Sequence, residues 1–118
     1  MNVDRTTEVR NAIITSAPLS KADNGVLIAW LQVSYGESGF QSFGGYSLYV
    51  PKANLANVMR SCAGHFIWRV LEIAGVDEWS QLPGKTIRVR IEGDRIDAIG
   101  HIVEDDWFCP REDFAAAK

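Results

Sequence analysis

The last third of the chain contains the pattern that most restricts the fold, an alternation of apolar and polar residues on each side of a tight turn. Isoleucine or valine occupies every second position of 87–91, and Gly93 and Asp94 follow shortly after. A two-residue connection of this kind joins antiparallel strands, whose side chains alternate between two faces. Segment 85–103 is therefore predicted to be a β-hairpin with one apolar face.

The register of this hairpin follows from the position of the turn. Centred on Gly93-Asp94, it pairs Ile91 with Ile96 and, further along, Val89 with Ala98. The polar face then holds two arginines and a histidine, namely Arg88, Arg90 and His101. A hairpin with one basic face is the expected result.

Three more strands are expected earlier in the chain. The runs 9–19 and 26–35 are rich in β-formers and flank an Asn-Gly pair, which tolerates the positive φ of a tight turn. The next segment, 36–45, holds four glycines and two aromatic residues and is expected to be an irregular loop. A third strand is expected at 46–50, where Pro51 stops it.

Apolar residues at helical spacing predict one long helix over 54–74. Asn54 is the expected N-cap, and Gly75 supplies the left-handed stop. A short helical turn is expected at 77–82. The tail after residue 103 should pack its aromatic side chains and end in a frayed, alanine-rich segment.

These elements predict a single α+β domain spanning 1–118, with an ordered core at about 8–114. The expected architecture is a five-stranded antiparallel sheet or an OB-like barrel, with the long helix between the third and fourth strands. At 118 residues and 47% hydrophobic composition, the chain suits one hydrophobic core.

Charge, cysteines and apolar runs limit the class of protein further. The net charge of −3 disfavours a non-specific grip on long nucleic acid, which requires excess lysine and arginine. The first eight residues hold no apolar stretch, so no secretory signal is expected, and the longest apolar run, 26–31, is too short to span a membrane. Cys62 and Cys109 match no metal spacing; two free thiols are the simpler interpretation, and a disulfide is the alternative. A cytoplasmic protein without a membrane partner is expected.

No residue pattern indicates catalysis, a metal or a cofactor. The acidic run 104–106 is interpreted as a solvated strand end, because neighbours in a strand point to opposite faces. His65 and His101 lack the accompanying signatures of nucleophilic or zinc enzymes. The glycine-rich segment does not fit a phosphate-binding loop. We therefore expect a protein that binds rather than an enzyme.

Basic and aromatic side chains remain as the candidate site. A guanidinium binds phosphate in a fork and a ring stacks on a base, so together they suit an anionic ligand with a flat base. The alternative is a purely structural role, with Trp68 half-buried and Arg90 paired with Asp97. The predicted ligand-binding residues are Phe40, Phe43, Tyr46, Arg60, His65, Trp68, Arg69, Arg88, Arg90 and His101.

Four motifs suggest a relationship to known proteins: F-G-G-Y at 43–46, G-H-F-I-W-R at 64–69, L-P-G-K at 82–85 and A-I-G-H-I-V at 98–103. Through them the chain resembles, over about 9–114, a group of small, mostly uncharacterised tailed-bacteriophage proteins. The group shares the F-G-G-Y loop, a helix ending I-A-G-V and an I-G-H-I-V-x-D-x-W-F tail. Residues 36–41 depart from the group, so a ligand preference is not carried over.

Three hypotheses about function follow. Because small non-catalytic phage proteins often counter host defences, the first, by analogy, is a counter-defence protein in the host cytoplasm. It would sequester a small anionic, nucleotide-like immune signal or occlude a host defence protein. The second is an OB-like single-stranded DNA-binding or recombination accessory protein, which the acidic charge disfavours. The third is a structural or assembly protein with Trp30 or Trp107 at a subunit interface. A homo-oligomer is compatible with the first and the third.

Overall fold

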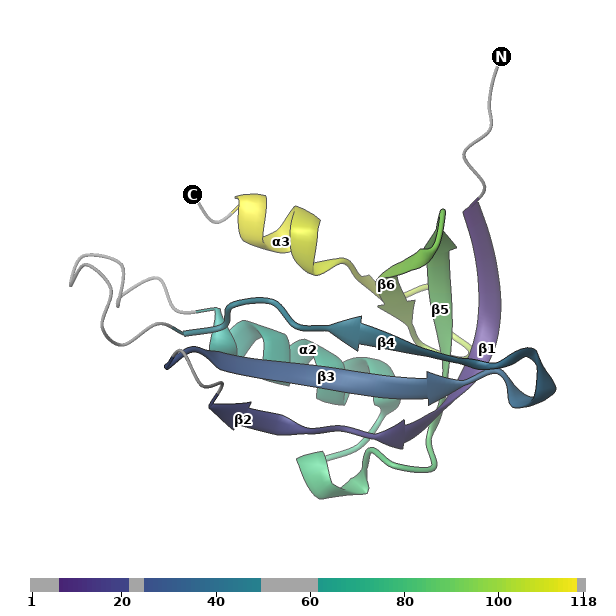
Figure 1. Ribbon diagram of the computed structural model, residues 1–118, viewed down its shortest axis with the longest axis horizontal. Helices are drawn as coiled ribbons and strands as arrows, with labels where there is room; N and C mark the ends of the chain where they lie inside the picture. The colour runs from purple at the N-terminus through teal and green to yellow at the C-terminus, as the bar shows by residue number, and fades with distance from the viewer. Residues whose placement is uncertain (1–6, 22–24, 50–61, 117–118) are drawn as a thin grey trace, which may run out of the picture.

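Antiparallel strands are the main secondary structure of the protein, whose computed structural model describes residues 7–21, 25–49 and 62–116 (Figure 1). The longer strands are β1 (Thr7–Ser16), β3 (Leu27–Ser34), β4 (Phe40–Gly44), β5 (Thr86–Glu92) and β6 (Arg95–Gly100). Two short strands, β2 (Leu19–Lys21) and β7 (Trp107–Phe108), extend the sheet. The helices are α2 (Ala63–Ala74) and α3 (Pro110–Ala116), and single 3-10 turns occupy 36–38 and 79–81.

Strand pairing curls this sheet toward a barrel. The longer strands pair in the order β4-β3-β1-β5-β6, and β1 and β2 pair with successive halves of β3. The two outer strands of this order, β4 and β6, lie side by side, although no ladder joins them among the described strands. The α+β class and the barrel-like sheet are confirmed, with a sheet of seven strands rather than five.

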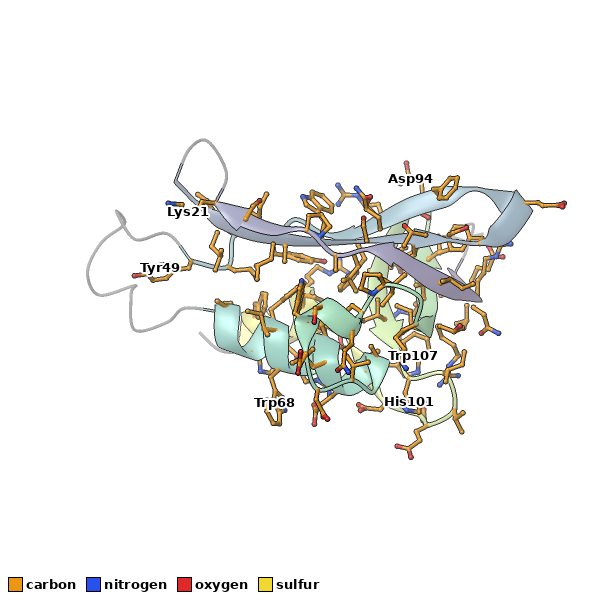
Figure 2. The ribbon with its side chains drawn as sticks, turned by 90° about the horizontal axis from the view of Figure 1, so that it is seen from below. Lys21, Tyr49, Trp68, Asp94, His101 and Trp107 are labelled. Carbon is orange, nitrogen blue, oxygen red and sulfur yellow. The ribbon has the colours of Figure 1, made fainter. Side chains whose placement is uncertain are left out.

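The core lies between the concave face of the sheet and α2. Along β3, Ala29, Leu31 and Val33 are buried, whereas Trp30 and Gln32 between them are exposed, as strand geometry requires. Helix α2 covers this inner face with the buried side chains Phe66, Val70 and Ile73. Figure 2 shows β3 and β4 on one side of the molecule and α2 on the other, so the outer face of these two strands is not covered by the helix.

The helix is shorter than expected. It begins at Ala63 after Cys62, whereas the expected N-cap, Asn54, lies outside the described residues, as do all of 50–61. Gly75 ends it with φ of +73°, as expected, and its N–H donates to the carbonyls of Leu71 and Glu72. Among the described helices, none has the length and apolar character needed to cross a membrane.

The position of the third strand was predicted wrongly. The strand β4 occupies 40–44, inside the segment expected to be a loop, and Tyr49 forms only a single bridge with Leu27. In the sequence, Gly44 and Gly45 suggest a turn, yet Gly44 ends a strand. Its φ is +121°, and a side chain there would overlap the carbonyl oxygen of Ala29 on β3. The glycine therefore marks a close approach of two strands.

The predicted hairpin is present as β5 and β6, with a change of register. Ile91 pairs with Ile96 as expected, but a bulge follows, so Val89 pairs with Ile99 instead of Ala98. The tail also differs from the expectation of a frayed end, because α3 continues to Ala116.

Candidate ligand-binding site

Those predicted basic and aromatic residues that the structure describes do not meet in one cleft, and most of their polar groups bind other parts of the protein. Arg69 donates to Asp106 Oδ1 at 2.8 Å and Glu72 Oε1 at 2.6 Å. Arg90 and Asp97 form a two-bond fork, each bond 3.0 Å long. These bonds raise the pKa of both guanidinium groups above the ordinary value, and Arg69 lowers the pKa of Asp106. Arg90 therefore pairs with Asp97, the contact that the structural alternative expected.

Arg88 and His101 hold the loop between β6 and β7. Arg88 donates to the backbone carbonyls of His101 and Glu104, both at 2.7 Å, and its guanidinium lies 5.0 Å from the ring centre of Trp107. His101 Nδ1 accepts the N–H groups of Val103 and Glu104, both at 3.0 Å. Both residues thus hold this loop through internal hydrogen bonds, which gives His101 of the I-G-H-I-V motif a structural role.

The predicted aromatic residues have different surroundings. Phe43 is fully buried and stacks on Phe66, with ring centres 6.0 Å apart, so a ligand cannot reach it from the surface. His65 lies on α2 and bonds to Asp113 at 2.7 Å. Phe40 on β4 is 78% exposed. Arg60 lies outside the described residues.

Trp68 borders a hollow at the end of α2 but has an unsuitable setting for an anion. Its side chain is 64% exposed, and the hollow of about 310 Å³ is also lined by Glu72, Asp77 and apolar residues. Among the described residues, the lining includes no cation, and the carboxylate of Glu72 already pairs with Arg69, so the hollow offers a phosphate no positively charged partner. Figure 2 shows Trp68 and His101 on the helix side of the molecule and Asp94 on the sheet side.

A groove on the sheet side has a composition that suits such a ligand. It lies where the free edge of β4 meets the turn between β5 and β6, and it measures about 200 Å³. We call it the seam groove, lined by Trp30, Gln41, Ser42, Gly44, Tyr46, Asp94, Arg95 and Ile96. Its walls therefore come from β3, β4, the β5–β6 turn and β6.

The indole ring of Trp30 is held against the backbone beside this groove. Gly45 has φ of +78°, and a Cβ atom there would overlap the six-membered ring of Trp30. The ring therefore packs directly on Gly45, while 38% of the residue remains exposed. An indole that packs on the backbone and stays partly exposed can serve as a stacking platform.

Gln41 fixes the distance between the two sides of the groove. Its Oε1 accepts from the hydroxyl of Tyr35 at 2.6 Å, and its Nε2 donates to the carbonyl of Asp94 at 2.6 Å. This pair of bonds ties the β5–β6 turn to β4 where no ladder joins the strands. Arg95 and Asp94 are thereby positioned opposite β4.

Arg95 provides the positive charge of the groove. Among the arginines at described positions, it is the one whose guanidinium makes neither a hydrogen bond nor an ion pair with a described residue. Tyr46 adds a phenol hydroxyl, and burial raises the pKa of this group above its ordinary value. Asp94 contributes the opposing negative charge. The groove can therefore offer a ring, a cation and a hydroxyl to one ligand.

Of the predicted site residues, Tyr46 lines this groove. Phe40 lies on β4, and other residues of β4 form part of the groove wall. Sequence reasoning did not include Trp30 and Arg95, which line the groove, among the candidate site residues. A signal for Trp30 existed, because a tryptophan between the buried residues Ala29 and Leu31 must face outward. Arg95 gave no such signal, since its lack of a carboxylate partner depends on tertiary structure.

Comparison of the chain with protein-family models, with curated proteins and with solved structures finds no match.

Proposed function

We propose that this protein is a non-catalytic binding protein for a ligand with a flat base and a phosphate, taken up at the seam groove. The base stacks on the exposed side of Trp30, and the phosphate binds the guanidinium of Arg95. The single observation that supports this most strongly is the fixed ring of Trp30 beside the one described arginine without an internal partner. Stacking and charge-assisted hydrogen bonds are the interactions by which proteins hold nucleotides.

The strand order supports the same location for the ligand. The order β4-β3-β1-β5-β6, with β4 beside β6 and a helix between β4 and β5, is that of an OB-like barrel. Barrels of this type bind ligands on the face of the strands that correspond to β3 and β4, together with neighbouring loops. The OB-like architecture is part of this proposal.

The resemblance to tailed-phage proteins adds a biological setting. A protein that binds a nucleotide-like compound without converting it withdraws that compound from other proteins in proportion to its own concentration. In an infected cell this activity would counter a defence that signals through nucleotides. The role of a sequestering counter-defence protein is therefore the setting that we propose for the binding activity.

Isothermal titration calorimetry tests the binding activity with three probes: a cyclic dinucleotide, ADP-ribose and hexathymidylate. We expect at least one of them to bind, and we expect Trp30→Ala and Arg95→Ala each to weaken its affinity about tenfold or more. Trp68→Ala and Lys85→Ala are matched controls, since each removes an exposed ring or cation outside the seam groove.

The outcomes separate the site from the activity. If no probe binds at millimolar concentration, the proposed function is wrong. If a probe binds but Trp68→Ala weakens it more than Trp30→Ala does, the ligand is bound on the helix side and the seam groove is not the site.

A further inference from the structure

A second exposed ring lies on the same outward face as Trp30. In the ladder between β3 and β4, Trp30 pairs with Gly44 and Ser34 pairs with Phe40. Side chains of a strand alternate between faces, so Phe40, Ser42 and Gly44 share one face of β4. The burial of Phe43 on the other face agrees with this. Phe40 is 78% exposed there, although burying such a ring is favourable.

The spacing of the two rings limits what can use both. Phe40 and Gly44 are four residues apart on β4, which corresponds to about 13 Å along the strand. Stacked neighbours in a nucleic acid strand are separated by about 3.4 Å. A single nucleotide cannot reach from one ring to the other, but a short single strand stretched across the face can.

The face between the two rings is less acidic than the chain as a whole and holds one cation for a phosphate. Ser42, midway between Phe40 and Gly44, lines the seam groove together with Arg95. The strands β3 and β4 contain no acidic residue, although the whole chain has a net charge of −3. Asp94 is the acidic residue among those that line the groove. A phosphate beside Ser42 therefore meets one guanidinium and one carboxylate.

The volume of the groove also favours an extended ligand. Pockets that enclose a small molecule measure about 300–1,000 Å³ and bury most of its surface. The seam groove measures about 200 Å³, so it can hold a phosphate or part of a base while the rest of the ligand lies on the open face.

We infer that the ligand of this protein is single-stranded nucleic acid that runs across β3 and β4, with one base on Trp30, another on Phe40 and an intervening phosphate at Arg95. This inference rests on the proposed function and specifies its ligand class. This mode of binding requires no base-specific contact, because every base has a face that can stack.

A length series tests it. Fluorescence competition at low salt compares thymidine monophosphate with oligothymidylates of two, four and six nucleotides, and with hexauridylate to distinguish DNA from RNA. We expect affinity to rise at least tenfold between the monophosphate and the four- or six-nucleotide strand. Phe40→Ala should remove most of that rise and leave the monophosphate unaffected, whereas Trp30→Ala should weaken every probe. Val103→Ala, which shortens an 80% exposed side chain elsewhere, is the control.

Asp94→Asn provides an independent measurement. Removing this carboxylate should strengthen oligonucleotide binding several-fold at low salt, with less effect at high salt.

Equal affinity for the monophosphate and the hexamer, or an unchanged length dependence in Phe40→Ala, would overturn the inference while leaving the proposed function intact. Failure of every length to bind would also overturn the inference, and the proposed function falls with it only if the cyclic dinucleotide and ADP-ribose fail to bind as well.

Discussion

Replacing Gly45 by alanine tests the structural basis of the Trp30 platform, because it adds one methyl group beneath the indole ring. At Gly45 the backbone has φ of +78°, a region that costs an L-amino acid about 1–2 kcal/mol. The added Cβ also overlaps the ring of Trp30, so the ring must move away from the backbone. Gly45→Ala therefore changes both stability and the geometry of the site.

The expected magnitudes follow from these two effects. The unfavourable φ should lower the free energy of unfolding by about 1–2 kcal/mol. Loss of stacking on a displaced ring should weaken ligand binding by about 1–3 kcal/mol, which is roughly 5- to 150-fold in affinity. Urea unfolding measures the first quantity, and fluorescence anisotropy with labelled hexathymidylate measures the second.

Gly84→Ala is the matched control. Gly84 also has a positive φ, +95°, but a Cβ atom there meets nothing within 4 Å. This variant should lose a similar amount of stability and keep its affinity for the oligonucleotide. If Gly45→Ala binds hexathymidylate as tightly as Gly84→Ala does, the indole is not held by the glycine and the reasoning is refuted.

Three further predictions concern residues that we assign to structure. Arg90→Lys should lower the free energy of unfolding by about 1 kcal/mol in urea titrations, because lysine cannot form the fork with Asp97, and should leave ligand affinity within twofold. His101→Ala removes the acceptor of two backbone N–H groups and should cost about 1–2 kcal/mol, whereas an unchanged unfolding midpoint would argue against this loop role. Arg69 lowers the pKa of Asp106 from its ordinary value of 3.8, so the stability from this pair is complete above about pH 4 and is lost as pH falls through the lowered pKa. The difference in unfolding free energy between the unmodified protein and Asp106→Asn should therefore shrink below about pH 4, and a constant difference down to pH 2 would contradict it.

Sequence patterns predicted the elements whose signals are local. The hairpin of β5 and β6 follows from alternation around a two-residue turn, and the end of α2 follows from the left-handed conformation of Gly75. The strand β4 was missed because Gly44 and Gly45 resemble loop residues. Gly44 has no room for a side chain because a carbonyl of β3 lies against it. Gly45 has none because the indole ring of Trp30 lies against it. Neither contact is visible before the strands are placed.

The candidate site was harder to predict for a related reason. Arginines are recognisable in a sequence, but their partners are not: Arg69 and Asp106 are 37 residues apart. The predicted basic set therefore consisted mostly of residues with internal partners. Trp30 and Arg95 come together only because β4 meets the β5–β6 turn, a tertiary arrangement that no local pattern reports.

The most direct test of the proposed site is a ¹H–¹⁵N NMR titration that follows the indole N–H signals of the four tryptophans, Trp30, Trp68, Trp79 and Trp107, as hexathymidylate is added. Trp79 donates its indole N–H to the carbonyl of Ala17, and Trp68 lies on the helix side, so neither is part of the proposed surface. The account predicts that the Trp30 signal shifts in proportion to saturation while the other three remain in place. A shift of the Trp68 signal without that of Trp30, or no shift at saturating oligonucleotide, would contradict it.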